Sequence, residues 1–103
     1  MFNFLKGIPT ISTNELSGRL SEDIKLLDVR SPAEYRSGHI AKAVNVPLNK
    51  IDTYNGKEKQ VYVICQSGMR SKKAAKALSK KGYEVTNVRG GMSQWNGKVR
   101  GGK

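Results

Sequence analysis

The chain has 103 residues, and its 19 lysines and arginines outnumber 8 acidic residues to give a formal net charge of +11. This length fits one domain, so residues 1–103 are treated as a single unit whose ends, 1–7 and 97–103, are expected to be frayed. The one cysteine, Cys65, excludes an internal disulfide. Together with the one histidine, His39, it also offers too few ligands for a usual zinc site.

Location and partners are restricted by the same features. No stretch approaches the ~20 apolar residues that span a bilayer, so no membrane partner is expected. Residues 1–7 lack the basic start of a secretion signal, and a free thiol suits a reducing compartment, so we expect a cytoplasmic protein. The positive charge is either a solvated basic surface or a field that attracts small anions or RNA. Because aromatic residues do not alternate with the basic ones, a nucleic-acid partner is not expected.

Short apolar runs alternate with helical patterns along the chain. The expected strands are Ile8 to Ile11, Ile24 to Val29, Ala43 to Val46, Val61 to Ile64 and Glu84 to Val88. The expected helices are a short one capped by Ser12 or Thr13, one from Ser31 to Gly38, one from Arg70 to Lys81, and a last turn through Trp95. The run from Val61 is apolar throughout, which is typical of a central strand covered on both faces. The alternation predicts an α/β domain with a mostly parallel sheet.

The second expected strand ends in charged residues that lead into a helix. Ser31, Pro32 and Glu34 have the N-cap, N1 and N3 spacing of a capping box. Asp28 and Arg30 are interpreted as a structural salt bridge and turn, with a carboxylate at the edge of a site as the alternative. Arg30 and Glu34 lie at i and i+4 and are also candidates for an ion pair, although the capping box is the simpler role for Glu34.

Cys65 follows the expected central strand, where ligands of parallel sheets bind. The segment that follows it, and that leads into the basic helix, is Gln66, Ser67, Gly68, Met69, Arg70 and Ser71. A short loop here directs backbone N–H groups inward as an anion-binding nest, and the helix N-terminus and Arg70 add positive charge. The loop therefore predicts a lowered pKa for Cys65 and a thiolate at neutral pH. A thiolate attacks without a neighbouring general base.

Three segments in order resemble the rhodanese family in its small single-domain form. The first runs from Leu27 through Asp28, Arg30 and the Gly38-His39-Ile40 triplet to Pro47, the second is the loop from Cys65 to Ser71, and the third is Arg89-Gly90-Gly91-Met92 with Trp95. The resemblance covers residues 8–96. It implies a central five-stranded parallel sheet flanked by helices, and a sulfurtransferase activity.

The resemblance also implies a mechanism and partners. Thiosulfate or a persulfide donor would pass its outer sulfur to Cys65, and the amides of residues 66–70 would hold the resulting persulfide. Arg70 would hold the anionic group of the donor. Small sulfur-containing anions, thiols, cyanide or an acceptor protein would be the partners of a monomer that needs no cofactor and no metal. The loop lacks the lysine of rhodaneses specialised for thiosulfate, so thiosulfate is not expected to be the physiological donor.

Two other functions are compatible with parts of this pattern. Related phosphatases with a cysteine nucleophile have five residues between Cys and Arg, whereas four separate Cys65 from Arg70, which favours a single sulfur atom over a phosphoryl group. A small-anion phosphatase or arsenate reductase is therefore the weaker enzyme hypothesis. A non-catalytic rhodanese-like binding module is the third, and such modules typically lose the cysteine. His39 is interpreted as structural, and Lys72 and Lys73 as residues that could steer anionic donors.

Overall fold

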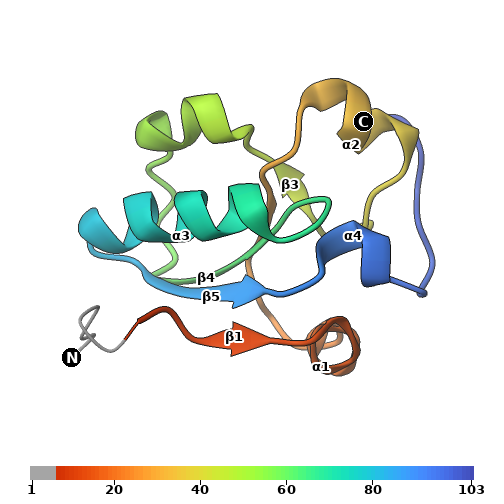
Figure 1. Ribbon diagram of the computed structural model, residues 1–103, viewed down its shortest axis with the longest axis horizontal. Helices are drawn as coiled ribbons and strands as arrows, with labels where there is room; N and C mark the ends of the chain where they lie inside the picture. The colour runs from red at the N-terminus through yellow and green to blue at the C-terminus, as the bar shows by residue number, and fades with distance from the viewer. Residues whose placement is uncertain (1–6) are drawn as a thin grey trace.

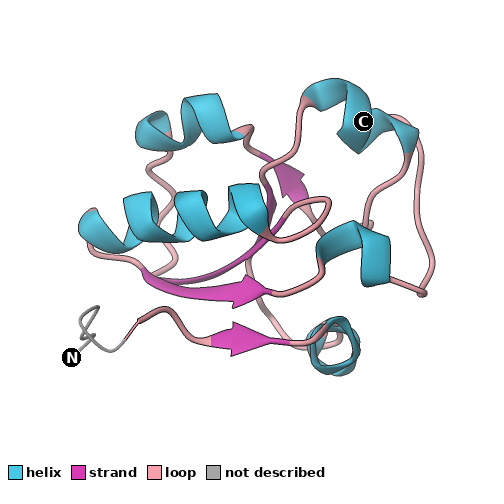
Figure 2. Cartoon of the chain, viewed as in Figure 1, coloured by secondary structure: helices cyan, strands magenta, loops and turns pink. Residues whose placement is uncertain are grey.

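The computed structural model describes residues 7–103, which form a parallel sheet with helices on both faces (Figures 1 and 2). The strands are β1 (Thr10–Ile11), β2 (Leu26–Asp28), β3 (Val44–Asn45), β4 (Gln60–Ile64) and β5 (Glu84–Val88). Their order in the sheet is β1-β5-β4-β2-β3, and every neighbouring pair is parallel. This confirms the predicted five-stranded α/β architecture, with the apolar run after Gln60 as the central strand.

The helices divide between the two faces of the sheet. They are α1 (Thr13–Arg19), α2 (Pro32–Ser37), the 3₁₀ helix η2 (Leu48–Thr53), α3 (Met69–Lys80) and α4 (Gly91–Gln94). On one face, α3 and η2 bury a core that includes Val63, Leu78 and Ile51. On the other face, Leu16 of α1 packs with Ile64 and with residues that flank α2 and α4. Figure 1 shows this division, with α3 and α1 on opposite sides of the sheet. Within residues 7–103, no helix is long and apolar enough to cross a membrane.

Local signals account for the ends of several elements. Ser12 and Ser31 cap α1 and α2, and each capping box is complete. The carboxylates of Glu15 and Glu34 accept hydrogen bonds from the backbone N–H groups of Ser12 and Ser31. The strand predicted from Ala43 to Val46 is shorter than expected, although the amide of Val46 still donates to the carbonyl of Asp28 at 2.9 Å. The strand ends there because Pro47 has no N–H to continue the pairing.

Two further features differ from the sequence-based expectation. The sequence pattern predicts no element over 48–53, because a 3₁₀ helix with a single buried residue, Ile51, has no periodicity to detect. The C-terminal tail, expected to be frayed, is hydrogen-bonded instead. The backbone of Arg100 exchanges two hydrogen bonds with that of His39, at 2.7 and 2.9 Å, and Gly102 N–H donates to the carbonyl of Arg36. The expected fraying at 1–7 concerns residues that, apart from Gly7, lie outside the described part of the chain.

The strand order positions the candidate site. The chain leaves β2 through α2 towards β3 at one edge, and leaves β4 through α3 towards β5 on the other side. The two connections therefore diverge between β2 and β4, and such a point opens a crevice beyond the carboxyl ends of the strands. Asp28 ends β2 and pairs with Ile64, the last residue of β4 before Cys65, so the fold brings the two segments singled out from the sequence to the same end of the sheet.

Candidate active site

The sulfur of Cys65 lies inside a tight loop at the start of α3. The backbone N–H of Gly68 donates to Sγ at 3.0 Å, and the Ser71 hydroxyl oxygen lies 3.4 Å from Sγ. Gly68 is the N-cap of α3 with φ at +106°, a left-handed conformation that favours glycine, and it has no side chain to cap the helix. The sulfur therefore accepts a bond at the helix terminus where a capping side chain would otherwise lie. Only 1% of the Cys65 surface is exposed.

Two opposing effects set the pKa of Cys65. Burial raises it, because the buried thiolate loses its water. Hydrogen bonds from the Ser71 hydroxyl and from the amides of Ser71, Gly68 and Ser67 lower it, and together they prevail, so the pKa lies below the ordinary value of a thiol. The direction agrees with the sequence-based prediction. The structure assigns it to hydrogen bonds in the loop.

The hydroxyl of Ser71 can serve both protonation states of the sulfur. The Ser71 hydroxyl oxygen lies 3.1 Å from the carbonyl oxygen of Gly68. When Cys65 is a thiol, its S–H donates to the Ser71 oxygen, and the Ser71 hydroxyl donates to the Gly68 carbonyl. When Cys65 ionises, the hydroxyl can turn to the sulfur. The Gly68 carbonyl then keeps the bond from the Lys72 amide at 3.2 Å. Ionisation therefore leaves no buried polar group in this set without a partner.

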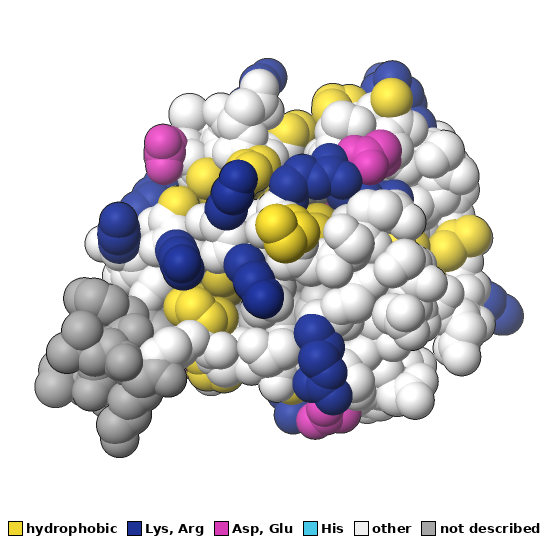
Figure 3. Space-filling view, viewed as in Figure 1, with side chains coloured by type: hydrophobic (Ala, Val, Ile, Leu, Met, Phe, Trp, Pro, Cys, Tyr) yellow, Lys and Arg dark blue, Asp and Glu magenta, His cyan; other side chains and the backbone are white. Residues whose placement is uncertain are grey.

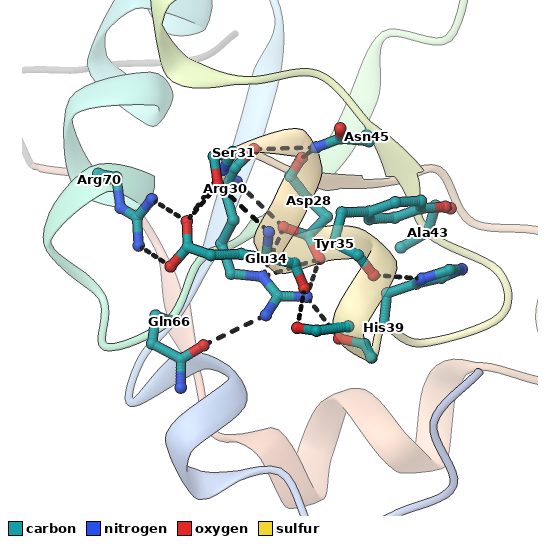
Figure 4. Close-up of polar contacts among 12 residues, drawn as sticks. Asp28, Arg30, Ser31, Glu34, Tyr35, His39, Ala43, Asn45, Gln66 and Arg70 are labelled. Atoms are coloured by element: carbon teal, nitrogen blue, oxygen red, sulfur yellow. Dashed lines mark hydrogen bonds and ion pairs between the residues drawn. The ribbon is translucent and has the colours of Figure 1, made fainter. Parts of the chain in front are cut away.

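Asp28 and Arg30 form a buried ion pair beneath the loop. Arg30 Nη2 lies 2.8 Å from Asp28 Oδ2, and its Nε donates to the same carboxylate (Figure 4). The guanidinium also donates to the side-chain oxygen of Gln66 at 3.2 Å and to the carbonyl of Gly38 at 2.8 Å. The interpretation as a structural salt bridge and turn fits this geometry. The prediction of an ion pair between Arg30 and Glu34 is wrong, because the Arg30 side chain is buried and pairs with Asp28.

Glu34 binds the arginine of the loop instead. Its two carboxylate oxygens lie 2.6 and 2.8 Å from the two terminal nitrogens of Arg70 (Figure 4). Oε1 also accepts from the backbone and hydroxyl of Ser31, which completes the capping box of α2. The hydrogen bonds with Arg70 are the main cause that lowers the pKa of Glu34 to about 2. Arg70, expected to hold a donor anion, is therefore already paired in this structure.

A pair of adjacent glycines, Gly90 and Gly91, starts the segment that holds the first residues of the loop. Gly90 and Gly91 have φ of +79° and +57°, and α4 begins at the second of them. The amide of Met92 then donates to the carbonyl of Cys65 at 2.8 Å, and that of Ser93 to the carbonyl of Gln66 at 2.9 Å. A Cβ at position 91 would overlap the Cys65 carbonyl oxygen. The sequence showed a Gly-Gly pair but not its partner, because the contact joins segments 26 residues apart, from position 65 to position 91.

The other predicted residues are divided between the interior and the surface. Ser71 is buried and Gln66 is half-buried, whereas Ser67 and Met69 reach solvent. His39 is buried, its Nδ1 lies 2.7 Å from the Tyr35 carbonyl, and its ring stacks on that of Tyr35, so the structure agrees with a structural role. Within residues 7–103, no three His, Cys, Asp or Glu side chains are grouped to hold a metal ion.

Comparisons with known proteins agree with this geometry. The model of the family described as "Rhodanese-like domain" matches residues 12–98. A protein named "Sulfurtransferase" from Allochromatium vinosum is 38% identical over 91 residues, which cover 82% of this chain and 85% of that protein. The uncharacterized protein YqhL of Bacillus subtilis is 40% identical over 83 residues, which cover 77% of this chain but only 66% of YqhL.

Solved structures give the same result. The crystal structure of a rhodanese-like domain protein from Staphylococcus aureus superposes with a TM-score of 0.81 at 31% identity, and the match covers 93% of this chain and all of that one. The family model spans most of the chain, including the loop after Cys65 and the Gly90-Gly91 pair. The chain therefore belongs to the rhodanese-like domain family.

Proposed function

We propose that this protein is a sulfurtransferase that carries sulfane sulfur as a persulfide on Cys65. The observation that carries the proposal is the position of Sγ, held by the Gly68 amide at 3.0 Å and beside the Ser71 hydroxyl at the N-terminus of α3. These groups stabilise a thiolate, which is the form that attacks sulfur. The relatives named as sulfurtransferases support the same activity.

The proposed reaction has two displacements on sulfur. In the first, the Cys65 thiolate attacks the outer sulfur of the donor, the donor's S–S bond breaks, and sulfite or a thiolate leaves with the electron pair. In the second, a thiolate or cyanide attacks the terminal sulfur of the Cys65 persulfide, the new S–S bond breaks, and the Cys65 thiolate returns. No net oxidation occurs, because the sulfane sulfur passes between nucleophiles. The fixed N–H groups of the loop favour the negative charge that develops on the bound sulfur.

The carboxylates near the loop argue against the phosphatase alternative. A phosphatase needs a protonated acid to release the alcohol of its substrate. Glu34, whose pKa is lowered to about 2, is ionised at neutral pH and bound by Arg70. Asp28 is buried in its ion pair with Arg30. Neither is available as a general acid, and the four-residue spacing between Cys65 and Arg70 favours sulfur as well.

Intact mass spectrometry tests the proposal directly. The wild type and Cys65→Ser are incubated with thiosulfate and, separately, with a small-molecule persulfide. We expect the wild type to gain one sulfur atom that cyanide removes, and the variant to gain none. Absence of the adduct with both donors would reject the proposal. Turnover of an aryl phosphate by the wild type, lost in Cys65→Ser, would support the phosphatase instead.

A further inference from the structure

The outer face of α3 combines an exposed apolar residue with an unbalanced run of positive charge. Met69, the first residue of α3, is 68% exposed, the highest value among the exposed large hydrophobic residues in the described part of the chain. It lies in the loop that encloses the buried Cys65. A single exposed hydrophobic residue is ordinary on protein surfaces, so its meaning depends on its surroundings.

Those surroundings are basic. Lys72, Lys73 and Lys76 are exposed on α3, and the helix contains no acidic residue. Figure 3, which looks onto this side of the molecule, shows Lys and Arg side chains gathered over α3, with hydrophobic atoms between them and few acidic groups. Across residues 60–103, ten basic residues accompany a single acidic one, Glu84. This face therefore has a strong positive potential beside the active-site loop.

The arrangement works against the stability of the helix. Lys72 and Lys76 are like charges at i and i+4, which repel each other. Lys72, the fourth residue of α3, also lies in the first turn of the helix, where the helix dipole favours negative charge. Solubility alone would be served equally well by lysines placed elsewhere or balanced by glutamates at i+4. The positions of these lysines are better explained by a negatively charged partner that approaches the loop.

The size and chemistry of the face indicate the kind of partner. From Met69 to Lys76 the exposed side chains extend about 10 Å along α3, which exceeds the dimensions of a small anion. An inorganic anion also gains nothing from Met69, whereas a methionine side chain adapts well to varied protein surfaces. The charges carry no alternating aromatic residues on which nucleic-acid bases would stack. An acidic protein surface with an apolar contact uses both features.

We propose that Met69, Lys72, Lys73 and Lys76, here called the α3 docking face, bind an acidic protein that presents a thiol as the sulfur acceptor. This inference rests on the proposed function and specifies its second step. The acceptor thiolate attacks the terminal sulfur of the Cys65 persulfide, the persulfide S–S bond breaks, and Cys65 leaves as the thiolate. The acceptor then carries the persulfide, and no oxidant or reductant is consumed.

The test uses three synthetic peptides of equal length, each with one cysteine flanked by acidic, serine or lysine residues. Protein loaded with sulfur is mixed with each peptide, and the second-order rate of sulfur loss is followed by mass spectrometry. We expect the acidic peptide to react about tenfold faster than the serine peptide at low salt, and the ratio to fall towards one as salt screens the charges. Equal rates for the three peptides would overturn the proposal.

Two triple variants localise the effect. The first variant replaces three lysines of the α3 docking face, Lys72, Lys73 and Lys76, with Glu. The second is a charge-matched control that replaces the exposed residues Lys57, Lys59 and Lys98 with Glu. The first should abolish or invert the preference for the acidic peptide, and the control should retain most of it. Met69→Ser should slow the acidic peptide several-fold at all salt concentrations, and Met69→Leu should not. An equal loss in both triple variants would show only the effect of net charge and would reject the α3 docking face.

The outcomes also separate this inference from the proposed function. Sulfur loss to 2-mercaptoethanol, which is small and uncharged, reports the chemistry alone. If the protein loads sulfur and passes it to 2-mercaptoethanol but shows no preference among the peptides, the docking proposal fails and the sulfurtransferase remains. If no sulfur is loaded, the proposed function fails first. A single-stranded RNA is also added to the sulfur-loaded protein. If the RNA binds to the α3 docking face while the acidic peptide reacts no faster than the serine peptide, the face is assigned to RNA and the acidic protein is rejected.

Discussion

Glu34 links the cap of α2 to the active-site loop by holding both terminal nitrogens of Arg70, at 2.6 and 2.8 Å. Each side chain remains about a third exposed, at 35% for Glu34 and 37% for Arg70. In the proposed sulfur transfer, a donor whose anionic group binds Arg70 would have to compete with Glu34. A persulfide donor without such a group avoids this competition. We therefore expect the pair to disfavour thiosulfate relative to a persulfide donor without such an anionic group.

Replacing Glu34 with Gln tests this competition. A partly exposed ion pair contributes about 0.2–1 kcal/mol, so freeing Arg70 should raise kcat/KM for thiosulfate by up to about fivefold. Glu15→Gln is the matched control, because Glu15 completes the same capping box on α1 with Ser12 but does not contact Arg70. Glu34→Gln should lose more stability than Glu15→Gln by about the 0.2–1 kcal/mol of the ion pair, and only Glu34→Gln should gain activity. An unchanged or lower kcat/KM in Glu34→Gln would contradict the competition.

The pH profile of sulfur loading should report Cys65 alone. Because the pKa of Glu34 is about 2, its pair with Arg70 stays ionised throughout an ordinary assay range. The pKa of Cys65 is lowered, so the thiolate forms earlier than in a free cysteine as pH rises. The loading rate should therefore increase with pH and reach its plateau below the ordinary pKa of a thiol. At pH values below the pKa of Cys65 the thiol is protonated and the loading rate declines. The midpoint of the pH profile therefore reports this pKa.

Ser71→Ala should move this midpoint to higher pH, because the largest of the effects that lower the pKa of Cys65 is the bond from the Ser71 hydroxyl. Ser67→Ala is the control, since residue 67 acts through its backbone amide, which the substitution keeps. Thiolate absorbance in the ultraviolet, followed against pH, gives both midpoints without a donor. Coincident midpoints for Ser71→Ala and the wild type would show that the hydroxyl does not stabilise the thiolate.

The elements that carry the site were predictable because their signals are local. Ser31 and Glu34 are three residues apart and define the start of α2 from the sequence alone. Likewise, the apolar run before Cys65 identifies the central strand. The partner of Arg70 was not predictable, because Glu34 lies 36 positions earlier and only the strand order brings them together. A spacing of i and i+4 between Arg30 and Glu34 suggested a pair that burial of Arg30 excludes.

The buried pair of Asp28 and Arg30 should be essential to stability. Asp28→Ala leaves the Arg30 guanidinium buried without its carboxylate, and breaking one partner of a buried pair costs about 3–5 kcal/mol. The free energy of unfolding measured with urea gives this loss. The double variant Asp28→Ala with Arg30→Met should be more stable than the sum of the two single changes predicts, since no unpaired charge remains. Simple additivity would show that the two side chains do not act together.

Gly91→Ala should disrupt the active-site loop more than the rest of the fold. The new methyl group would lie 2.8 Å from the carbonyl carbon of Gln66 and would overlap the Cys65 carbonyl oxygen, and a φ of +57° adds backbone strain. Gly18→Ala is the control, because Gly18 lies in α1 with open space around it, so alanine should stabilise the helix by about 0.5–1 kcal/mol. We expect sulfur loading by Gly91→Ala to fall at least tenfold under conditions in which circular dichroism still shows a folded protein. Wild-type loading in that folded variant would mean that α4 can withdraw without moving Cys65, and that the bonds from Met92 and Ser93 do not position the sulfur.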